Sequence, residues 1–149
     1  MISRAQEFFR RHFGDAGEAA VTGEQQLRVA VAALLLEVLR ADYEVSAEES
    51  RQVLASVGSM LKLSDAEAEE VMALAEAEIH KAHDLFQFTS QVNAAFDHEQ
   101  KMRLVEELWR VARSDELVHK YEEHIIRRVA GLLHLRHSEF ITTKLRAGA

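Results

Sequence analysis

A chain of 149 residues without cysteine forms no disulfide or thiolate metal site, and its net charge of −7 argues against binding a nucleic-acid backbone. Nearly half of the residues are apolar, proline is absent and helix-forming residues dominate, which predicts an all-α fold. No apolar run is long enough to span a bilayer, and the N-terminus lacks the apolar core of a signal peptide. We therefore expect a cytoplasmic protein.

The N-terminal segment, residues 1–23, differs from the rest of the chain. Residues 3–13 predict a short amphipathic helix with phenylalanines on one side and arginines on the other, and residues 14–23 predict a linker. Residues 1–13 have a net charge of +2, whereas residues 14–149 have −9. We expect this helix to be an appendage of a bundle formed by residues 24–149. It either packs on that bundle or makes a peripheral contact with an anionic membrane or partner.

Helical apolar spacing predicts the remaining elements, and capping patterns mark where several of them begin. Each of these patterns is a Ser, Thr or Asp followed three residues later by Glu or Gln: Thr22/Gln25, Ser46/Glu49, Ser64/Glu67, Asp84/Gln87 and Asp97/Gln100. The predicted helices are 24–40, 46–61, 64–80, 84–95, 97–113, 120–133 and 137 to the C-terminus. With the N-terminal helix, this gives a bundle of about seven to eight helices. The helix over 84–95 is expected to be buried through its apolar residues, namely Phe86, Phe88 and Val92.

The sequence also contains an internal repeat. Residues 31–49 align with residues 104–122, and after a slip of one residue the match continues to Leu63 and Leu135. This predicts two related three-helix units. In each copy an aspartate and a glutamate flank an apolar residue between two helices, and the four acidic residues are Asp42, Glu49, Asp115 and Glu122.

Oxygen-rich corners of this kind can hold a divalent cation, Ca²⁺ or Mg²⁺ more readily than Zn²⁺. The spacing is not that of an EF-hand, because Ser46, Ala47 and Val53 occupy the required fifth, sixth and twelfth positions. The alternative is purely structural, since Glu49 also stands where a capping-box glutamate belongs. A second metal candidate is formed by Glu76, His80 and His83, which share a helix face and could hold Zn²⁺ or Ni²⁺; the alternative is a polar helix end.

The repeated pattern resembles the TerB-like (tellurite-resistance protein B) family, over roughly residues 25–145. Asp42, Val45 and Glu49 match its motif in the first half, and Asp115, Val118 and Glu122 match in the second. The family's glycine is replaced by Tyr43 and Glu116. The resemblance implies a helical bundle, acidic residues that bind a divalent cation, and an accessory role in stress or tellurite-resistance complexes near the membrane.

We therefore expect a non-enzymatic TerB-like accessory module that binds a divalent cation and docks protein partners. The alternative is a metal-free structural bundle whose acidic corners are only helix caps. A metal-dependent enzyme is the least favoured, because no glycine-rich phosphate loop, Gly-x-Ser-x-Gly or His-Glu-x-x-His motif occurs.

Overall fold

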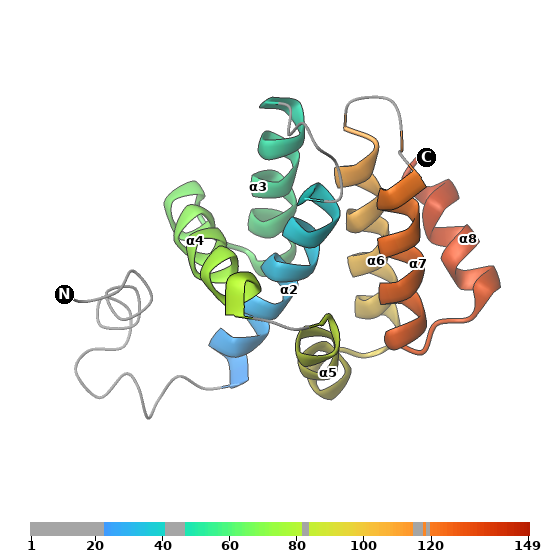
Figure 1. Ribbon diagram of the computed structural model, residues 1–149, viewed down its shortest axis with the longest axis horizontal. Helices are drawn as coiled ribbons and strands as arrows, with labels where there is room; N and C mark the ends of the chain where they lie inside the picture. Colours follow the sequence, from blue (N-terminus) through green and yellow to red (C-terminus); the bar gives the residue numbers. More distant parts are fainter. Residues whose placement is uncertain (1–22, 41–46, 82–83, 115–117, 119) are drawn as a thin grey trace.

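The computed structural model describes residues 23–40, 47–81, 84–114, 118 and 120–149, and this part of the chain folds into seven α-helices (Figure 1). Their bounds are α2 (Gly23–Arg40), α3 (Ala47–Leu61), α4 (Asp65–Lys81), α5 (Phe86–Ala95), α6 (His98–Ala112), α7 (Lys120–Leu132) and α8 (His137–Arg146). The predicted all-α class is confirmed. The helix predicted over residues 3–13 lies outside the described residues and stays a prediction.

Helix α2 lies at the centre of the bundle, in contact with α3, α4, α5, α6 and α7 (Figure 1). Its sequence is apolar on nearly every side, and a helix of that kind is stable only when other elements cover it all round. Val31, Leu34, Leu35 and Val38 are completely shielded from solvent. The predicted central position of this helix is confirmed.

Helix α6 organises the other half of the bundle, because it contacts both α7 and α8. The joint between α6 and α8 is aromatic: the ring centroids of Trp109 and Phe140 lie 5.2 Å apart, and both side chains are buried. In the first half, α2 likewise has two partner helices, α3 and α4. The halves are joined because α6 also packs against α2 and α3. These contacts are compatible with two three-helix units, and the internal duplication stays a prediction.

The turns that end α3 and α7 have the same backbone conformation. Lys62 and His134 follow these helices with φ of 57° and 66°, in the left-handed region that non-glycine residues rarely adopt. The N–H of Leu63 donates to the carbonyl of Gly58 at 3.0 Å, and the N–H of Leu135 donates to that of Ala130 at 3.0 Å. These are the bonds of a Schellman helix end, and they occur at positions that the sequence repeat aligns.

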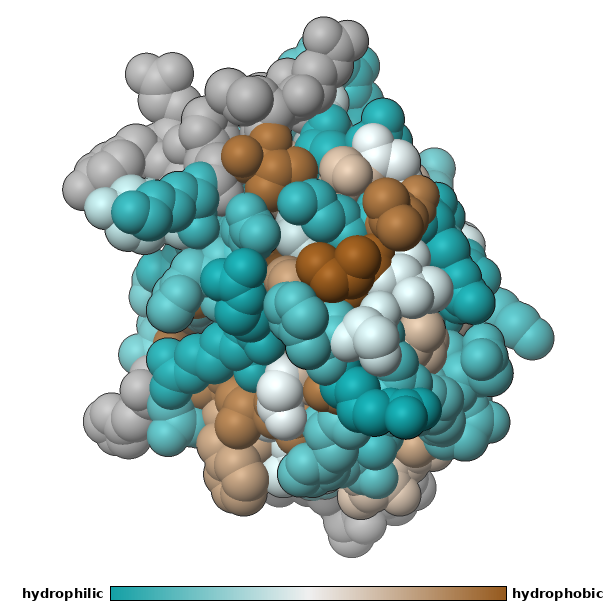
Figure 2. Space-filling model, turned by 90° about the vertical axis from the view of Figure 1, so that its right-hand side faces the viewer, coloured by the Kyte–Doolittle hydropathy of each residue, from teal (hydrophilic) through white to brown (hydrophobic). Residues whose placement is uncertain are grey.

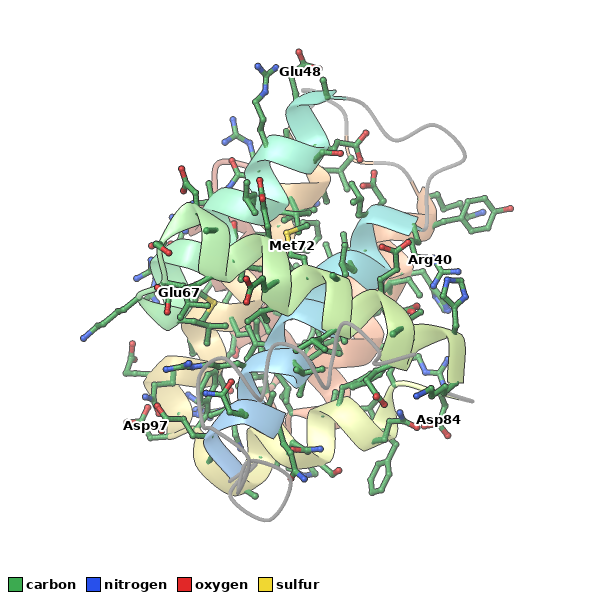
Figure 3. All side chains as sticks on the ribbon, turned by 90° about the vertical axis from the view of Figure 1, so that its left-hand side faces the viewer. Arg40, Glu48, Glu67, Met72, Asp84 and Asp97 are labelled. Atoms are coloured by element: carbon green, nitrogen blue, oxygen red, sulfur yellow. The ribbon has the colours of Figure 1, made fainter. Side chains whose placement is uncertain are left out.

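Two of the predicted capping boxes are confirmed. The N–H of Glu67 donates to Ser64 Oγ at 3.2 Å, and the N–H of Ser64 donates to Glu67 Oε1 at 3.0 Å. Asp97 and Gln100 exchange two hydrogen bonds of 2.8 Å at the start of α6. Figure 3 shows Glu67 and Asp97 at these helix starts. Thr22 and Ser46 lie outside the described residues.

The capping box predicted at Asp84 is wrong. The Asp84 carboxylate accepts from the N–H of Phe86 at 2.8 Å instead of that of Gln87, and the N-cap of α5 is Leu85, one residue later than predicted. The predicted burial of Phe86 is also wrong, because its side chain is 62% exposed. With Leu85 and Phe88 turned to the core, the helical period directs Phe86 outward.

The outer face of α8 leaves apolar side chains in contact with solvent. Phe140 is buried, whereas Ile141 and Leu145, on the same helix, are 37% and 70% exposed. Figure 2 shows this side of the molecule, where hydrophobic residues are scattered among hydrophilic ones. Apolar residues scattered in this way are ordinary on a protein surface, so they define no binding face by themselves.

At the two left-handed positions, a glycine variant is expected to be more stable than an alanine variant. Lys62→Gly and His134→Gly should each raise the free energy of unfolding by about 0.5–1 kcal/mol relative to Lys62→Ala and His134→Ala, because glycine adopts positive φ without steric cost. Both native side chains are exposed, so little packing is lost. Chemical denaturation of the four variants measures the difference, and an alanine variant as stable as its glycine counterpart would contradict the prediction.

Candidate functional site

Two of the four predicted site residues are placed by the structure, and both are buried. Glu49 lies in the first turn of α3 and Glu122 in the first turn of α7, and their exposed fractions are 1% and 0%. Figure 1 shows that α3 and α7 begin at the same end of the bundle, which is the end where α2 and α6 stop. Burying a carboxylate is costly unless hydrogen bonds, an opposite charge or a metal ion compensate for the lost water.

Helix capping alone does not require this burial. Glu67 caps α4 and Gln100 caps α6 with the same sequence spacing, yet Glu67 is only partly buried and Gln100 is exposed. Glu48, directly before Glu49, extends outward at the start of α3 (Figure 3). The two corner glutamates therefore differ from ordinary capping residues in how deeply they lie.

The other two predicted ligands, Asp42 and Asp115, lie outside the described residues, as do Tyr43 and Glu116 of the motif. Among the residues that the structure does describe, no three His, Cys, Asp or Glu side chains come together as a possible metal group. The second metal candidate, on α4, is not supported by the described residues either, because Glu76 and His80 are exposed and His83 is not described. A complete site would therefore need groups from the segments that precede α3 and α7.

The structure also shows a buried polar cluster that we did not predict from the sequence. Glu107, in the middle of α6, is only 3% exposed. Its Oε2 accepts from Ser56 Oγ of α3 at 2.7 Å, and its Oε1 accepts from Arg103 Nε at 3.1 Å and Arg110 Nη1 at 2.5 Å. Arg110 Nη2 also donates to Glu106 at 2.6 Å. The only sequence signal was a glutamate three and four residues from arginines, a pattern that is usually solvent-exposed.

This cluster lines an open cleft of about 500 Å³ between α3 and α6. Burial alone would lower the pKa of Arg110, but the charge of Glu107 and the bonds to both glutamates outweigh it, so the pKa is raised above its ordinary value. Two arginines and two glutamates leave the cleft without net charge, and the acceptors of Glu107 are satisfied by the hydrogen bonds described above. We interpret the cluster as a polar joint between α3 and α6.

Comparison with known proteins places these features in a family. The family model described as tellurite resistance protein TerB matches residues 28–145. The chain belongs to the TerB family. No curated protein and no solved structure matches it.

The TerB match covers most of the bundle, from α2 to α8, and includes both acidic corners and the polar cluster on Glu107. It leaves out the first 27 residues, which contain the predicted N-terminal helix. The match confirms the resemblance to the TerB-like family that the repeated acidic motif indicated. In the described part of this TerB protein, no helix is long and apolar enough to cross a membrane.

The polar cluster leads to a stability prediction. Glu107→Gln should lower the free energy of unfolding by about 1–3 kcal/mol, because two guanidinium groups lose a buried charged acceptor. Glu106→Gln is the matched control, since its side chain is 14% exposed and contacts Arg110 alone among the ion pairs described. Chemical denaturation compares the two variants, and equal losses of stability would contradict a special role for the buried position.

Proposed function

We propose that this TerB protein is a non-enzymatic accessory module of the cytoplasm that binds divalent cations and docks a protein partner. Each cation would be held at one acidic corner, by Glu49 with Asp42 and by Glu122 with Asp115. Ca²⁺ or Mg²⁺ suits such oxygen ligands better than Zn²⁺. The observation that supports the proposal best is the near-complete burial of both corner glutamates.

The physical argument starts from the cost of a buried negative charge. The N-terminus of a helix offers partial positive charge to a carboxylate, but this effect amounts to about 0.3–1 kcal/mol at an exposed site and up to about 2 in a partly buried one. Both glutamates also have interaction partners within the chain, and a divalent cation would add a direct charge interaction to these contacts. Such a cation needs several oxygen ligands around it. An aspartate stands seven residues before each glutamate. Its carboxylate and the backbone carbonyls between the two residues can supply these oxygens.

A metal-free structural bundle is the second candidate, and a specific observation favours it. The Ser64/Glu67 and Asp97/Gln100 boxes show that this spacing acts as a simple cap elsewhere in the same chain. Under this alternative Glu49 and Glu122 only complete the starts of α3 and α7. Both candidates leave out catalysis, because the sequence contains no motif that joins a nucleophile to a base.

The double variant Glu49→Gln with Glu122→Gln separates the two candidates. Glutamine keeps the capping bond, as Gln100 demonstrates in α6, but loses the charge and the second carboxylate oxygen that a hard cation prefers. If a cation binds, millimolar Ca²⁺ or Mg²⁺ should raise the melting temperature of the wild-type protein. At a hundred times Kd the gain is about 2.7 kcal/mol, or roughly 5–10 °C for a chain of this size. The double variant should lose this gain.

Glu67→Gln is the control, because Glu67 caps α4 outside the proposed cation sites; this variant should retain the full response to cations. Calorimetric titration with Ca²⁺, Mg²⁺ and Mn²⁺ gives an independent measurement of binding. If the wild-type protein shows neither heat nor a change of melting temperature at millimolar cation, the metal-free bundle is the correct candidate. If only Zn²⁺ acts, the proposed ligand chemistry is wrong.

A further inference from the structure

An apolar groove lies between the first turns of α2 and the C-terminal half of α5. Its volume is about 620 Å³, and its walls include Gly23, Glu24 and Leu27 of α2 and Ala94 and Ala95 of α5. Glu24 is the one charged side chain among them, and it is paired with Arg28 at 3.2 Å. Leu27 is partly buried, whereas Ala94 and Ala95 are exposed. The groove is therefore suited to apolar side chains rather than to an ion.

The groove lies next to the point where the preceding part of the chain is attached. Gly23, the first described residue, is itself part of the groove wall, and residues 1–22 come immediately before it. The amphipathic helix predicted over residues 3–13 would be about 16 Å long. The nine residues that follow it, 14–22, can span up to about 30 Å when extended. Because Gly23 lines the groove, this linker is long enough for the helix to fold back toward it.

The N-terminal segment also needs a surface to cover its apolar side. A single helix of eleven residues is not stable by itself in water, because isolated helices shorter than about 12–15 residues are marginal. Its apolar stripe contains Phe9 and Phe13, with Phe8 beside it. Its arginines give residues 1–13 a net charge of +2, opposite to the −9 of the remaining chain, so that electrostatic attraction favours docking on the bundle.

We propose that residues 3–13 bind as a helix in the α2–α5 groove of their own molecule. Phe9 and Phe13 would lie against Leu27, Ala94 and Ala95, and the arginines would face solvent and the acidic body. This proposal is independent of cation binding, because the groove contains none of the four corner residues.

Disulfide trapping can test the proposal directly, because the chain has no cysteine of its own. Two double variants place one cysteine in the segment and one in the groove while keeping both phenylalanines: Ala5→Cys with Ala94→Cys, and His12→Cys with Ala94→Cys. The matched control pairs Ala5→Cys with Ala77→Cys, an exposed alanine on the acidic helix α4. A disulfide requires Cα atoms about 4.4–6.8 Å apart, so it reports direct contact.

We expect at least one groove pair to form an intramolecular disulfide at least about tenfold faster than the control pair, because docking raises the effective concentration of the two thiols. Non-reducing electrophoresis and mass spectrometry of the full-length monomer measure the rates. The proposal is overturned if the control pair reacts as fast as both groove pairs, or if neither groove pair reacts. Disulfide-linked dimers would instead show that the groove binds the segment of a second copy.

Thermal unfolding gives a second measurement that needs no cysteine. Phe9→Ser with Phe13→Ser should lower the melting temperature by about 4 °C or more, because two phenyl rings lose their apolar burial. Leu145→Ser, at an exposed apolar position, is the control and should change it little. An unchanged melting temperature in the phenylalanine variant would contradict docking in the groove. If the wild-type protein also pellets with phosphatidylserine vesicles, the segment contacts membranes instead.

Discussion

Burial of α2 on all sides is the constraint on which the bundle depends. This helix contacts five of the six other described helices, and four of its large side chains have no exposure at all. An apolar helix of this kind has no stable position at a surface, so α3, α4, α5, α6 and α7 must all be present for it to fold. The two halves of the chain therefore share one core, whatever the origin of the sequence repeat.

The buried carboxylates of the described residues lie where helices begin or where two helices meet. Glu49 and Glu122 are buried where α3 and α7 begin, and Glu107 connects α6 to Ser56 of α3. Buried carboxylates contribute little to net stability compared with apolar residues of the same size, but losing one partner is costly. Such groups favour one packing arrangement over other arrangements of similar apolar content. In this TerB protein, the bond from Ser56 to Glu107 joins α3 to α6 in this way.

The sequence predicted the helices well because their starts have local chemical signals. Ser64/Glu67 and Asp97/Gln100 mark the beginnings of α4 and α6, and both boxes form as predicted. The orientation of α5 was predicted less well. Leu85, Phe86 and Phe88 are all apolar within a short helix, so the pattern does not define which side faces the core; the packing of α5 on α2 decides it.

The candidate site was predicted only in part. The position of Glu49 in a first turn followed from the capping pattern, and that of Glu122 followed from the sequence repeat. Their burial depends on neighbouring helices that no local pattern describes. Glu107 was missed for the same reason. Its arginine neighbours three and four residues away are typical of an exposed helix face, and only the approach of α3 makes the site an interior one.

The joint between α6 and α8 has an optical consequence. Trp109 is the only tryptophan of the chain, it is fully buried, and it has the ring of Phe140 beside it and Lys144 Nζ 5.3 Å from its ring centroid. Any separation of α8 from α6 would bring water and a different electric field to this single indole. The unmodified protein thus contains a fluorescent reporter of one specific helix contact, and its emission can be followed without attaching a dye.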